Sequence, residues 1–254
     1  MTASLAGRAV LVTRPAHQAA SLAQAIEAAG GEAIRFPALA IDAMPAAELA
    51  AALAWLREAD AVIFISPNAA QFGMAAIGLL PAGAKVFAVG PGTARELAHS
   101  GQHTVIVPDG QDSEALLALP ELAHVGGQRI VIVRGVGGRP FLADTLKARG
   151  AEVRFMECYR RVRPQADAAP LLARWQAGGV DAVTVASAET LANLLAMLGE
   201  AGGPLLAATP LFAPHEKIVA SARSLGLAHA QATAGGDAGL VDGMIRWFNT
   251  RTNT

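Results

Sequence analysis

The chain has 254 residues, of which 53% are hydrophobic and 16% charged, and its formal net charge is −1. This composition excludes an intrinsically disordered chain, which requires low hydrophobicity and high net charge. At about 150 residues per domain, the length predicts one large domain or two modest ones. The single cysteine, Cys158, excludes an internal disulfide framework and is typical of the reducing cytoplasm.

Neither a membrane span nor a signal peptide is expected. Prolines and glycines interrupt the longest uncharged stretch, residues 61–84, so that no run of about 20 apolar residues remains. Arg8 lies within the only apolar stretch near the N-terminus, which argues against a signal peptide.

In chain order, short β-branched runs alternate with alanine- and leucine-rich amphipathic stretches. The expected strands are 9–13, 33–36, 61–65, 85–89, 104–107, 129–133, 152–158, 182–185, 211–213 and 229–232. The expected helices are 18–29, 47–58, 68–77, 93–99, 113–119, 140–149, 169–176, 189–198, 215–224 and 238–248. This alternation predicts parallel sheets with crossover helices, and hence an α/β fold.

An internal repeat relates two parts of the chain. Residues 11–14 (LVTR) align with 131–134 (VIVR) at an offset of 120, and Asp60–Val62 aligns with Asp181–Val183 at an offset of 121. Coincidence in a biased composition is the alternative explanation. We therefore expect two similar α/β domains, with ligands outside the carboxyl ends of their strands.

Arginine accounts for most of the positive charge and gathers in one segment. Residues 129–163 carry nine basic and three acidic side chains, and only three of the chain's 20 basic residues are lysines. The guanidinium group pairs with carboxylates and phosphates through two hydrogen bonds, so an acidic ligand is one interpretation and a solvated basic surface is the other. Nucleic acid is not an expected partner, because the overall charge is balanced and aromatic residues do not alternate with the basic ones.

Several strand-to-helix turns have the composition of anion-binding sites. They are Ser66–Asn68, Gly90–Thr93, Arg134–Arg139 and Ser187 with its flanking residues. A helix N-terminus offers free N–H groups and the positive end of the helix dipole to an anion. The alternative is ordinary helix capping by Ser66, Thr93, Ser113 and Ser187.

The common cofactor motifs are missing from the sequence. Pro140 stands where the last glycine of G-x-G-x-x-G belongs, and neither a P-loop nor a G-x-S-x-G motif occurs. His99 and His103 are separated by Gly101 and do not share a helical face, so a metal site is not expected. We predict neither a cofactor nor a metal.

Tyr159 is the only tyrosine, and it is surrounded by arginines in residues 157–161 (ECYRR). A phenol stays protonated at neutral pH and can donate a proton to a leaving oxygen, so Tyr159 is a candidate general acid. The alternative is a tyrosine that only packs the chain. Cys158 beside it is expected to be a small buried apolar residue.

Taken in order, these motifs resemble the uroporphyrinogen-III synthase family over essentially the whole chain. The matching residues are 12–15 (VTRP), 64–69 (FISPNA), 89–94 (VGPGTA), 134–139 with Leu142, 150–153 (GAEV) leading to Tyr159, and Pro214–His215. The chain departs from the family pattern at residues 185–187 and 216–218.

The resemblance implies a discontinuous domain one, residues 1–36 and 164–254, and a domain two, residues 37–163. Two linker strands, near 37–41 and 159–164, would join two similar α/β domains with the active site in the cleft between them. The implied reaction closes hydroxymethylbilane, a linear tetrapyrrole with eight carboxylates, into uroporphyrinogen III, with loss of water and inversion of ring D. The implied protein is a cytoplasmic monomer without membrane or nucleic-acid partners.

The site residues implied are Tyr159 as the catalytic acid and a set of substrate-binding residues. These are Arg14, Ser66, Asn68, Gly90, Gly92, Thr93, Ser113, Arg134, Arg139, Ser187, Pro214 and His215. Two other functions stay open. One is a non-catalytic two-domain module that binds a tetrapyrrole or another carboxylate ligand, and the other is a different two-domain α/β enzyme, such as a nucleotide-sugar transferase without a recognisable nucleotide motif.

Overall fold

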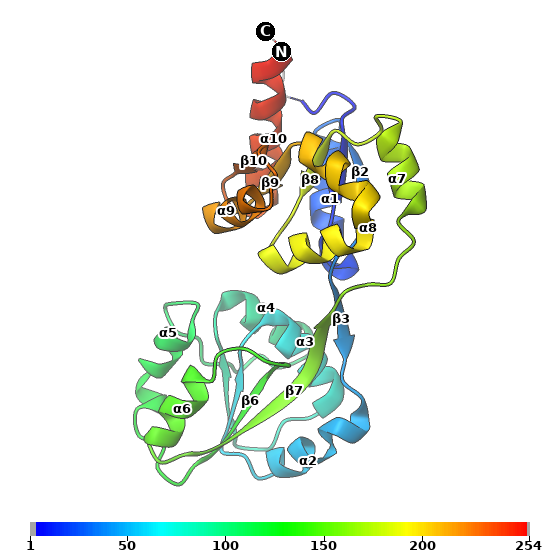
Figure 1. The fold of residues 1–254 in the computed structure, drawn as a ribbon. Coiled ribbons are helices and arrows are strands. Elements are labelled where there is room, and N and C mark those ends of the chain that lie inside the picture. Colours follow the sequence, from blue (N-terminus) through cyan, green and yellow to red (C-terminus); the bar gives the residue numbers. More distant parts are fainter. Residues whose placement is uncertain (1–3, 253–254) are drawn as a thin grey trace. The chain divides into compact units, whose positions relative to one another are not determined.

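A computed structural model describes residues 4–252, which divide into two compact units (Figure 1). Unit 1 comprises Met1–Ala40 and Val162–Thr254, and unit 2 comprises Ile41–Arg161. The ends of the expected domain one, residues 1–3 and 253–254, lie outside the described residues. The chain therefore passes from one unit to the other twice, near residue 40 and near residue 162.

The sheet of unit 1 has the strand order β10-β9-β8-β1-β2, and its neighbouring strands run parallel. The strands are β1 (Ala9–Val12), β2 (Glu32–Arg35), β8 (Ala182–Thr184), β9 (Leu211–Ala213) and β10 (Ala230–Ala232). Successive side chains of β1 enter opposite cores, Leu11 on one face and Val10 and Val12 on the other, as the two-residue period of a strand requires.

Helices cover both faces of this sheet. They are η1 (Ala16–Gln18), α1 (Ala19–Ala28), α7 (Ala169–Gln176), α8 (Ala188–Ala208), α9 (Glu216–Ser224) and α10 (Gly236–Thr252). Apolar residues of α7, α8 and α9 pack on one face, and those of α1 and α10 pack on the other.

The helix α8 is long and apolar enough to cross a membrane by length and composition alone. Its leucines 191, 194, 198 and 206 are buried in the core of unit 1. Gly199 (φ 62°, ψ −162°) interrupts the helix, and Pro204 lies in its second part. The sequence predicts an end at residue 198, but the chain turns at Gly199 and resumes a helix that packs in the same core.

The sheet of unit 2 has the strand order β3-β7-β6-β4-β5, in which β7, β6, β4 and β5 run parallel. The strands are β3 (Ala40–Ala43), β4 (Ala61–Phe64), β5 (Lys85–Ala88), β6 (Arg129–Gly135) and β7 (Glu152–Val162). The expected strand at 104–107 is wrong, because in that stretch only Ile106 forms an isolated parallel bridge, with Phe87.

Helices also cover both faces of the second sheet. They are α2 (Ala46–Leu56), α3 (Pro67–Ile77), α4 (Pro91–His99), α5 (Ser113–Leu117), η2 (Pro120–Leu122) and α6 (Phe141–Ala148). One core contains apolar residues of α2, α3 and α4, and the other contains those of α5, η2 and α6. The chain is thus an α/β protein with two largely parallel sheets, each flanked by helices on both faces.

The internal repeat corresponds to the same strand arrangement in both units. In unit 1, Leu11 of β1 pairs with Val183 of β8, and in unit 2 Val131 of β6 pairs with Val62 of β4. These residues are related by the offsets of 120 and 121. The chain order of the two halves is exchanged, however: β1-α1-β2 comes first in unit 1, whereas β6-α6-β7 comes last in unit 2. The two units are therefore circular permutations of one doubly wound arrangement.

Candidate functional site at the switch point of unit 2

A pocket of about 150 Å³ lies at the carboxyl ends of the central strands of unit 2. The neighbouring strands β4 and β6 send their crossover helices, α3 and α6, to opposite faces of the sheet. Doubly wound proteins bind ligands where the winding direction changes in this way. The residues that line the pocket are Ile65, Ser66, Arg134, Gly135, Val136, Gly137, Gly138, Tyr159 and Arg161.

Ser66 begins the helix on the β4 side of the pocket. Its backbone is extended (φ −166°, ψ 160°), and its Oγ accepts a hydrogen bond of 3.0 Å from the N–H of Ala69. Pro67 at the first helical position suits this start, because its ring fixes a helical φ and it has no N–H to satisfy. The expected cap at Ser66 is confirmed.

Tyr159 lies beside Ser66, with only 4% of its surface exposed. Its hydroxyl oxygen is 3.2 Å from Ser66 Oγ, and its ring is 5.8 Å from that of Phe72, centroid to centroid. An irregularity in the β6–β7 pairing between Arg134 and Gly135 brings Gly135 opposite Tyr159. The phenol is therefore held between two strands and a helix, and Tyr159 forms part of the pocket lining.

The tyrosine ring requires a glycine at position 135. A Cβ atom there would lie 2.5 Å from Cε2 and 2.6 Å from Cζ of Tyr159, which is closer than carbon atoms approach one another. The sequence indicates an anion site at the glycines of this turn. In the structure one of them, Gly135, makes room for the ring of Tyr159.

Arg134 brings a buried positive charge to the same pocket, with 5% of its surface exposed. Its Nε donates to the carbonyl of Gly135 at 3.1 Å and its Nη1 to that of Arg139 at 3.4 Å, and its guanidinium lies 4.7 Å from the centroid of Phe155. Within residues 4–252 it forms no ion pair with a carboxylate. A buried charge without a counter-ion is costly, so this group favours an acidic ligand.

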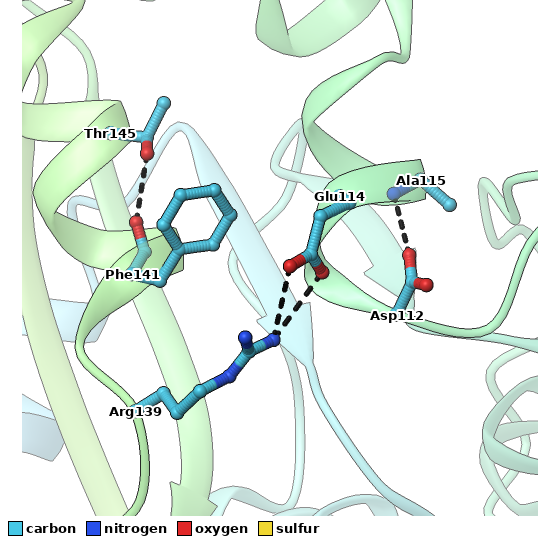
Figure 2. A network of polar contacts seen from close by, with 6 residues as sticks. All are labelled: Asp112, Glu114, Ala115, Arg139, Phe141 and Thr145. Carbon is cyan, nitrogen blue, oxygen red and sulfur yellow. Dashed lines mark hydrogen bonds and ion pairs between the residues drawn. The ribbon is translucent and has the colours of Figure 1, made fainter.

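The two other arginines near the pocket differ in their partners. Arg161 lines the pocket, is exposed, and pairs with no acidic side chain in the described chain. Arg139 instead donates to both carboxylate oxygens of Glu114, at 3.2 and 3.4 Å, as Figure 2 shows. Arg139 also lies outside the pocket lining, and its charge is paired with that of Glu114.

The helix starts at α4 and α5 correct part of the capping interpretation. The residue that caps α4 is Gly90 and not Thr93, which lies buried in the first turn after Pro91. The residue that caps α5 is Asp112 and not Ser113: Asp112 Oδ1 accepts from the N–H of Ala115 at 2.8 Å (Figure 2). Pro91 takes the first helical position, so α4 begins two residues before Thr93. The carboxylate of Asp112 caps α5 one residue before Ser113.

The remaining predicted contacts in unit 2, Gly90, Gly92, Thr93 and Ser113, lie outside this pocket, as does Asn68 of α3. A Cβ at Gly92 would be 3.7 Å from Pro67, so the starts of α3 and α4 are adjacent. Four further predicted residues belong to unit 1: Arg14, Ser187, Pro214 and His215. His215 begins α9 without a capping hydrogen bond from its side chain.

Unit 1 has a corresponding switch point between β1 and β8. Ser187 caps α8 by accepting from the N–H of Thr190 at 3.0 Å, as Ser66 caps α3. Arg14 stands at the position equivalent to Arg134, but its guanidinium pairs with the carboxylate of Asp237 in the first turn of α10. The expected resemblance of the two turns therefore extends to their residues and not to their charge balance.

Cys158 is excluded as a nucleophile at this site. Burial raises the pKa of its thiol to about 12, so the reactive thiolate is absent at neutral pH. Its Sγ lies 3.5 Å from the carbonyl oxygen of Arg134. The prediction of a small buried residue is confirmed.

Sequence reasoning missed Ile65 and Arg161 as pocket residues, whereas Val136 belongs to the turn Arg134–Arg139 that it singled out. Arg161 belongs to the basic segment of the sequence. Only the structure shows that β7 passes the pocket, so that Arg161, two residues after Tyr159, lines it. Among residues 4–252 no group of three His, Cys, Asp or Glu side chains is arranged to hold a metal ion.

The fold and the pocket define an α/β protein of two related doubly wound units, with a pocket that is lined by one phenol and two guanidinium groups. Such a site suits an acidic molecule with an oxygen that can accept a proton. The family model described as uroporphyrinogen-III synthase HemD matches residues 20–242.

Relatives and a solved structure agree with that match. Uroporphyrinogen-III synthase from Escherichia coli (strain K12) is 38% identical over 195 residues, which cover 74% of this chain and 79% of that protein. The Salmonella typhimurium enzyme of the same name is 39% identical over 193 residues, covering 73% and 78%. A mutant uroporphyrinogen III synthase from Thermus thermophilus shares the fold, with a TM-score of 0.60 at 19% identity over 96% of this chain and 100% of that one. The chain belongs to the uroporphyrinogen-III synthase family.

Proposed function

We propose that this chain is a uroporphyrinogen-III synthase, which closes hydroxymethylbilane into uroporphyrinogen III with loss of water and inversion of ring D, in tetrapyrrole and heme biosynthesis. Loss of water from one substrate makes the enzyme a lyase, specifically a hydro-lyase. The observation that supports this most directly is the pocket of unit 2, where Tyr159 lies hydrogen-bonded to Ser66 and beside the buried Arg134.

The size of the pocket limits what it can hold. Sites for whole small molecules usually measure about 300–1,000 Å³, whereas this one measures about 150 Å³. It is therefore suited to one substituent of a tetrapyrrole, either a carboxylate arm or the hydroxymethyl group. Arg134 and Arg161 favour the carboxylate arm, and we propose that Tyr159 meets the hydroxymethyl oxygen of the same or the adjacent ring.

The chemistry proposed for Tyr159 is proton donation to the leaving group. The bond between the methylene carbon and the hydroxyl oxygen breaks as the phenol gives its proton to that oxygen, and water departs. The pyrrole nitrogen supplies the electron pair that replaces the broken bond. The methylene carbon then bonds to ring D, and inversion of this ring breaks one carbon–carbon bond and forms another. The proton that the closed macrocycle loses on regaining aromaticity restores the phenol. Because the linear substrate also closes unaided to the wrong isomer, most of the catalysis is orientation.

The other parts of the proposal concern partners and location. We propose a cytoplasmic monomer that uses neither cofactor nor metal and binds neither membrane nor nucleic acid. The predicted contacts outside the pocket stay part of the proposed substrate-binding surface. They are Arg14, Asn68, Gly90, Gly92, Thr93, Ser113, Arg139, Ser187, Pro214 and His215.

One assay tests the function. Purified protein is supplied with hydroxymethylbilane, and the type I and type III isomers of the oxidised product are resolved by chromatography. We expect the type III isomer at a rate well above spontaneous closure. Formation of the type I isomer alone, at the spontaneous rate, would contradict the proposal and favour a non-catalytic ligand-binding module.

A further inference from the structure

The contact between Ser66 and Tyr159 links a helix cap to the candidate acid. Ser66 Oγ has two described neighbours: it accepts from the N–H of Ala69 at 3.0 Å, and it lies 3.2 Å from the Tyr159 hydroxyl. One lone pair of Oγ is occupied by the N–H, while its own proton is available. The serine can therefore donate to the phenol oxygen while it caps α3.

We propose that Ser66 is a positioning residue that orients the phenol of Tyr159 as a proton donor. The hydrogen bonds then run in one direction, from the N–H of Ala69 to Ser66 Oγ, from Ser66 Oγ–H to the Tyr159 oxygen, and from the Tyr159 O–H to the leaving oxygen of the substrate. This inference rests on the proposed function, because it requires a leaving oxygen at Tyr159.

Two physical effects favour this direction. A hydroxyl that accepts one hydrogen bond is polarised and becomes a better donor, so the N–H of Ala69 strengthens the donation from Ser66. The N-terminus of α3 also carries the positive end of the helix dipole, which favours the negative charge that develops on the phenol oxygen as its proton leaves. Donation in the reverse sense would direct the phenol proton away from the substrate.

The surroundings leave the ring little freedom to rotate out of this arrangement. Phe72 packs on one side at 5.8 Å between centroids, and Gly135 lies against the ring edge. The N–H of Val136 donates to the Tyr159 carbonyl at 2.8 Å and fixes the backbone. Tyr159 is thus held by packing, and the hydrogen bond from Ser66 decides where its proton points.

Helix capping alone does not require a tyrosine at this place. In unit 1 the equivalent Ser187 also caps its helix, but its hydroxyl meets Thr190 Oγ1 at 2.9 Å. The residue that the repeat aligns with Tyr159 is Leu39, at the offset of 120, and it carries no hydroxyl. The same cap therefore engages the phenol only in the unit that contains the pocket.

The test is a double-mutant cycle with Ser66→Ala and Tyr159→Phe, assayed for kcat, KM and product isomer. We expect Ser66→Ala to lower kcat about two- to tenfold, the factor that one neutral hydrogen bond supplies, with KM unchanged. In the Tyr159→Phe background the same substitution should have no further effect on kcat. Ser66→Thr, which keeps the hydroxyl, should restore kcat. Equal losses from Ser66→Ala in both backgrounds would overturn the proposal.

A spectroscopic titration tests the direction of the hydrogen bond without any substrate. Because the chain has one tyrosine, the absorbance of tyrosinate reports on Tyr159 alone. If Ser66 donates to the phenol oxygen, it stabilises the ionised form, and Ser66→Ala should ionise at higher pH. A shift to lower pH would mean that Tyr159 donates to Ser66, and would overturn the proposal. The charged groups that line the pocket together with the ring are Arg134 of β6 and Arg161 of β7. Phe72 of α3 does not titrate.

Loss of the cap is controlled separately. Asp112→Ala removes the N-cap of α5 in the same unit and should lower the melting temperature while kcat stays at the wild-type value. A fall in kcat for this variant as large as that of Ser66→Ala would assign the effect to stability and overturn the proposal. A wild-type protein that forms only the type I isomer would instead contradict the proposed function, whatever the titration shows.

Discussion

The switch points of the two units have the same arrangement of strands and helices, but their arginines differ in ion pairing. Each has a serine that caps a helix and an arginine at the carboxyl end of a central strand, at positions related by the repeat. In unit 1 the arginine is Arg14, which pairs with Asp237, and the side chains of this pair are 19% and 25% exposed. In unit 2 it is Arg134, which is 5% exposed and has only carbonyls and a phenylalanine ring as described partners.

The side-chain hydrogen bonds between the two central strands also differ, because they occur in unit 1 and not at the equivalent positions of unit 2. In unit 1, Thr13 Oγ1 donates to the carbonyl of Thr184 at 2.6 Å, and Thr184 Oγ1 donates to that of Leu11 at 3.0 Å, all of them buried. Unit 2 has Val133 and Ile63 at the equivalent positions. Unit 1 therefore pairs its polar groups with one another at the switch point, whereas the described partners of Arg134 in unit 2 include no carboxylate. Two units with the same strand arrangement can thus differ in how the polar groups at their switch points are paired.

The largest expected effect is that of removing the phenol hydroxyl of Tyr159, the one tyrosine of the chain. Tyr159→Phe keeps the ring packed on Phe72 and should slow turnover by roughly tenfold to a few hundredfold, the lower part of what a general acid contributes. Substrate binding and the type III isomer should persist. The assay is kcat together with the melting temperature: a wild-type rate with a lowered melting temperature would make Tyr159 a packing residue only.

Filling the space beneath the ring tests whether the pocket depends on Gly135. Gly135→Ala places a Cβ 2.5 Å from the ring of Tyr159, so the ring must move. A displacement of about 1 Å at a catalytic group can cost about a hundredfold in rate, and we expect a loss of that size in kcat. The control is Gly126→Ala, whose Cβ would meet only the carbonyl oxygen of Arg149 at 3.9 Å. Similar activity in both variants would show that the glycine is not needed for the acid.

Replacing each arginine by methionine separates the two switch points directly. Hydrogen bonds to a charged group contribute about 1.5–3 kcal/mol, so Arg134→Met should raise KM about tenfold to a hundredfold. Its stability should change little, because a buried charge without a carboxylate partner is removed. Arg14→Met should instead lower the free energy of unfolding by up to about 1 kcal/mol, because it leaves Asp237 unpaired. It should raise KM less than Arg134→Met does.

Chemical denaturation and steady-state kinetics on the two variants give all four quantities. The comparison between the units would be wrong if Arg134→Met were the more destabilising variant and Arg14→Met the one with the larger KM. Equal behaviour of the two arginines would mean that Asp237 does not distinguish them.

Much of the fold follows from local sequence signals. The β-branched runs at 9–13 and 129–133 predicted the two central strands, and the offset of 120 between them identified Arg14 and Arg134 as equivalent. The signal failed where a partner far away in the sequence decides the outcome. Residues 104–107 are apolar enough for a strand, yet only Ile106 bridges to β5. At Gly199 the helix breaks as expected, but core packing of Leu206 supports a second helical segment.

The site was predicted in part. Ser66, Arg134 and Tyr159 directly follow the strands expected from the sequence, and their convergence agrees with the rule for parallel sheets. The contribution of Gly135 depends on the irregular β6–β7 register, which no local pattern announces. Arg139 pairs with Glu114, 25 residues earlier in the chain, and such a tertiary partner is invisible in the sequence. The predicted contact of Arg139 with substrate stays a prediction.

The smallest expected effect concerns a pair of glutamates that the repeat makes equivalent. Glu32 in unit 1 accepts from Arg174 Nη1 at 2.9 Å and from Nη2 at 2.5 Å, and these hydrogen bonds hold the pKa of Glu32 below its ordinary value of 4.5. A carboxyl whose pKa is lowered on folding stabilises the folded state above its unfolded pKa. This contribution disappears as the pH falls through the folded value. Both side chains are solvent-exposed, so the effect is screened by water and salt.

Glu32→Gln should therefore lower the melting temperature slightly at neutral pH, and the difference from the wild type should shrink as the pH falls below about 4.5. The matched control is Glu152→Gln in unit 2, because Glu152 lies at 3.9 Å from Arg129 Nε and has a weaker ion pair. We expect that variant to differ less from the wild type at neutral pH. Thermal melts of the three proteins between pH 3 and pH 7 measure both differences. A gap for Glu32→Gln that persists at the acid end would show that packing, and not the charge on Glu32, is what the substitution removes.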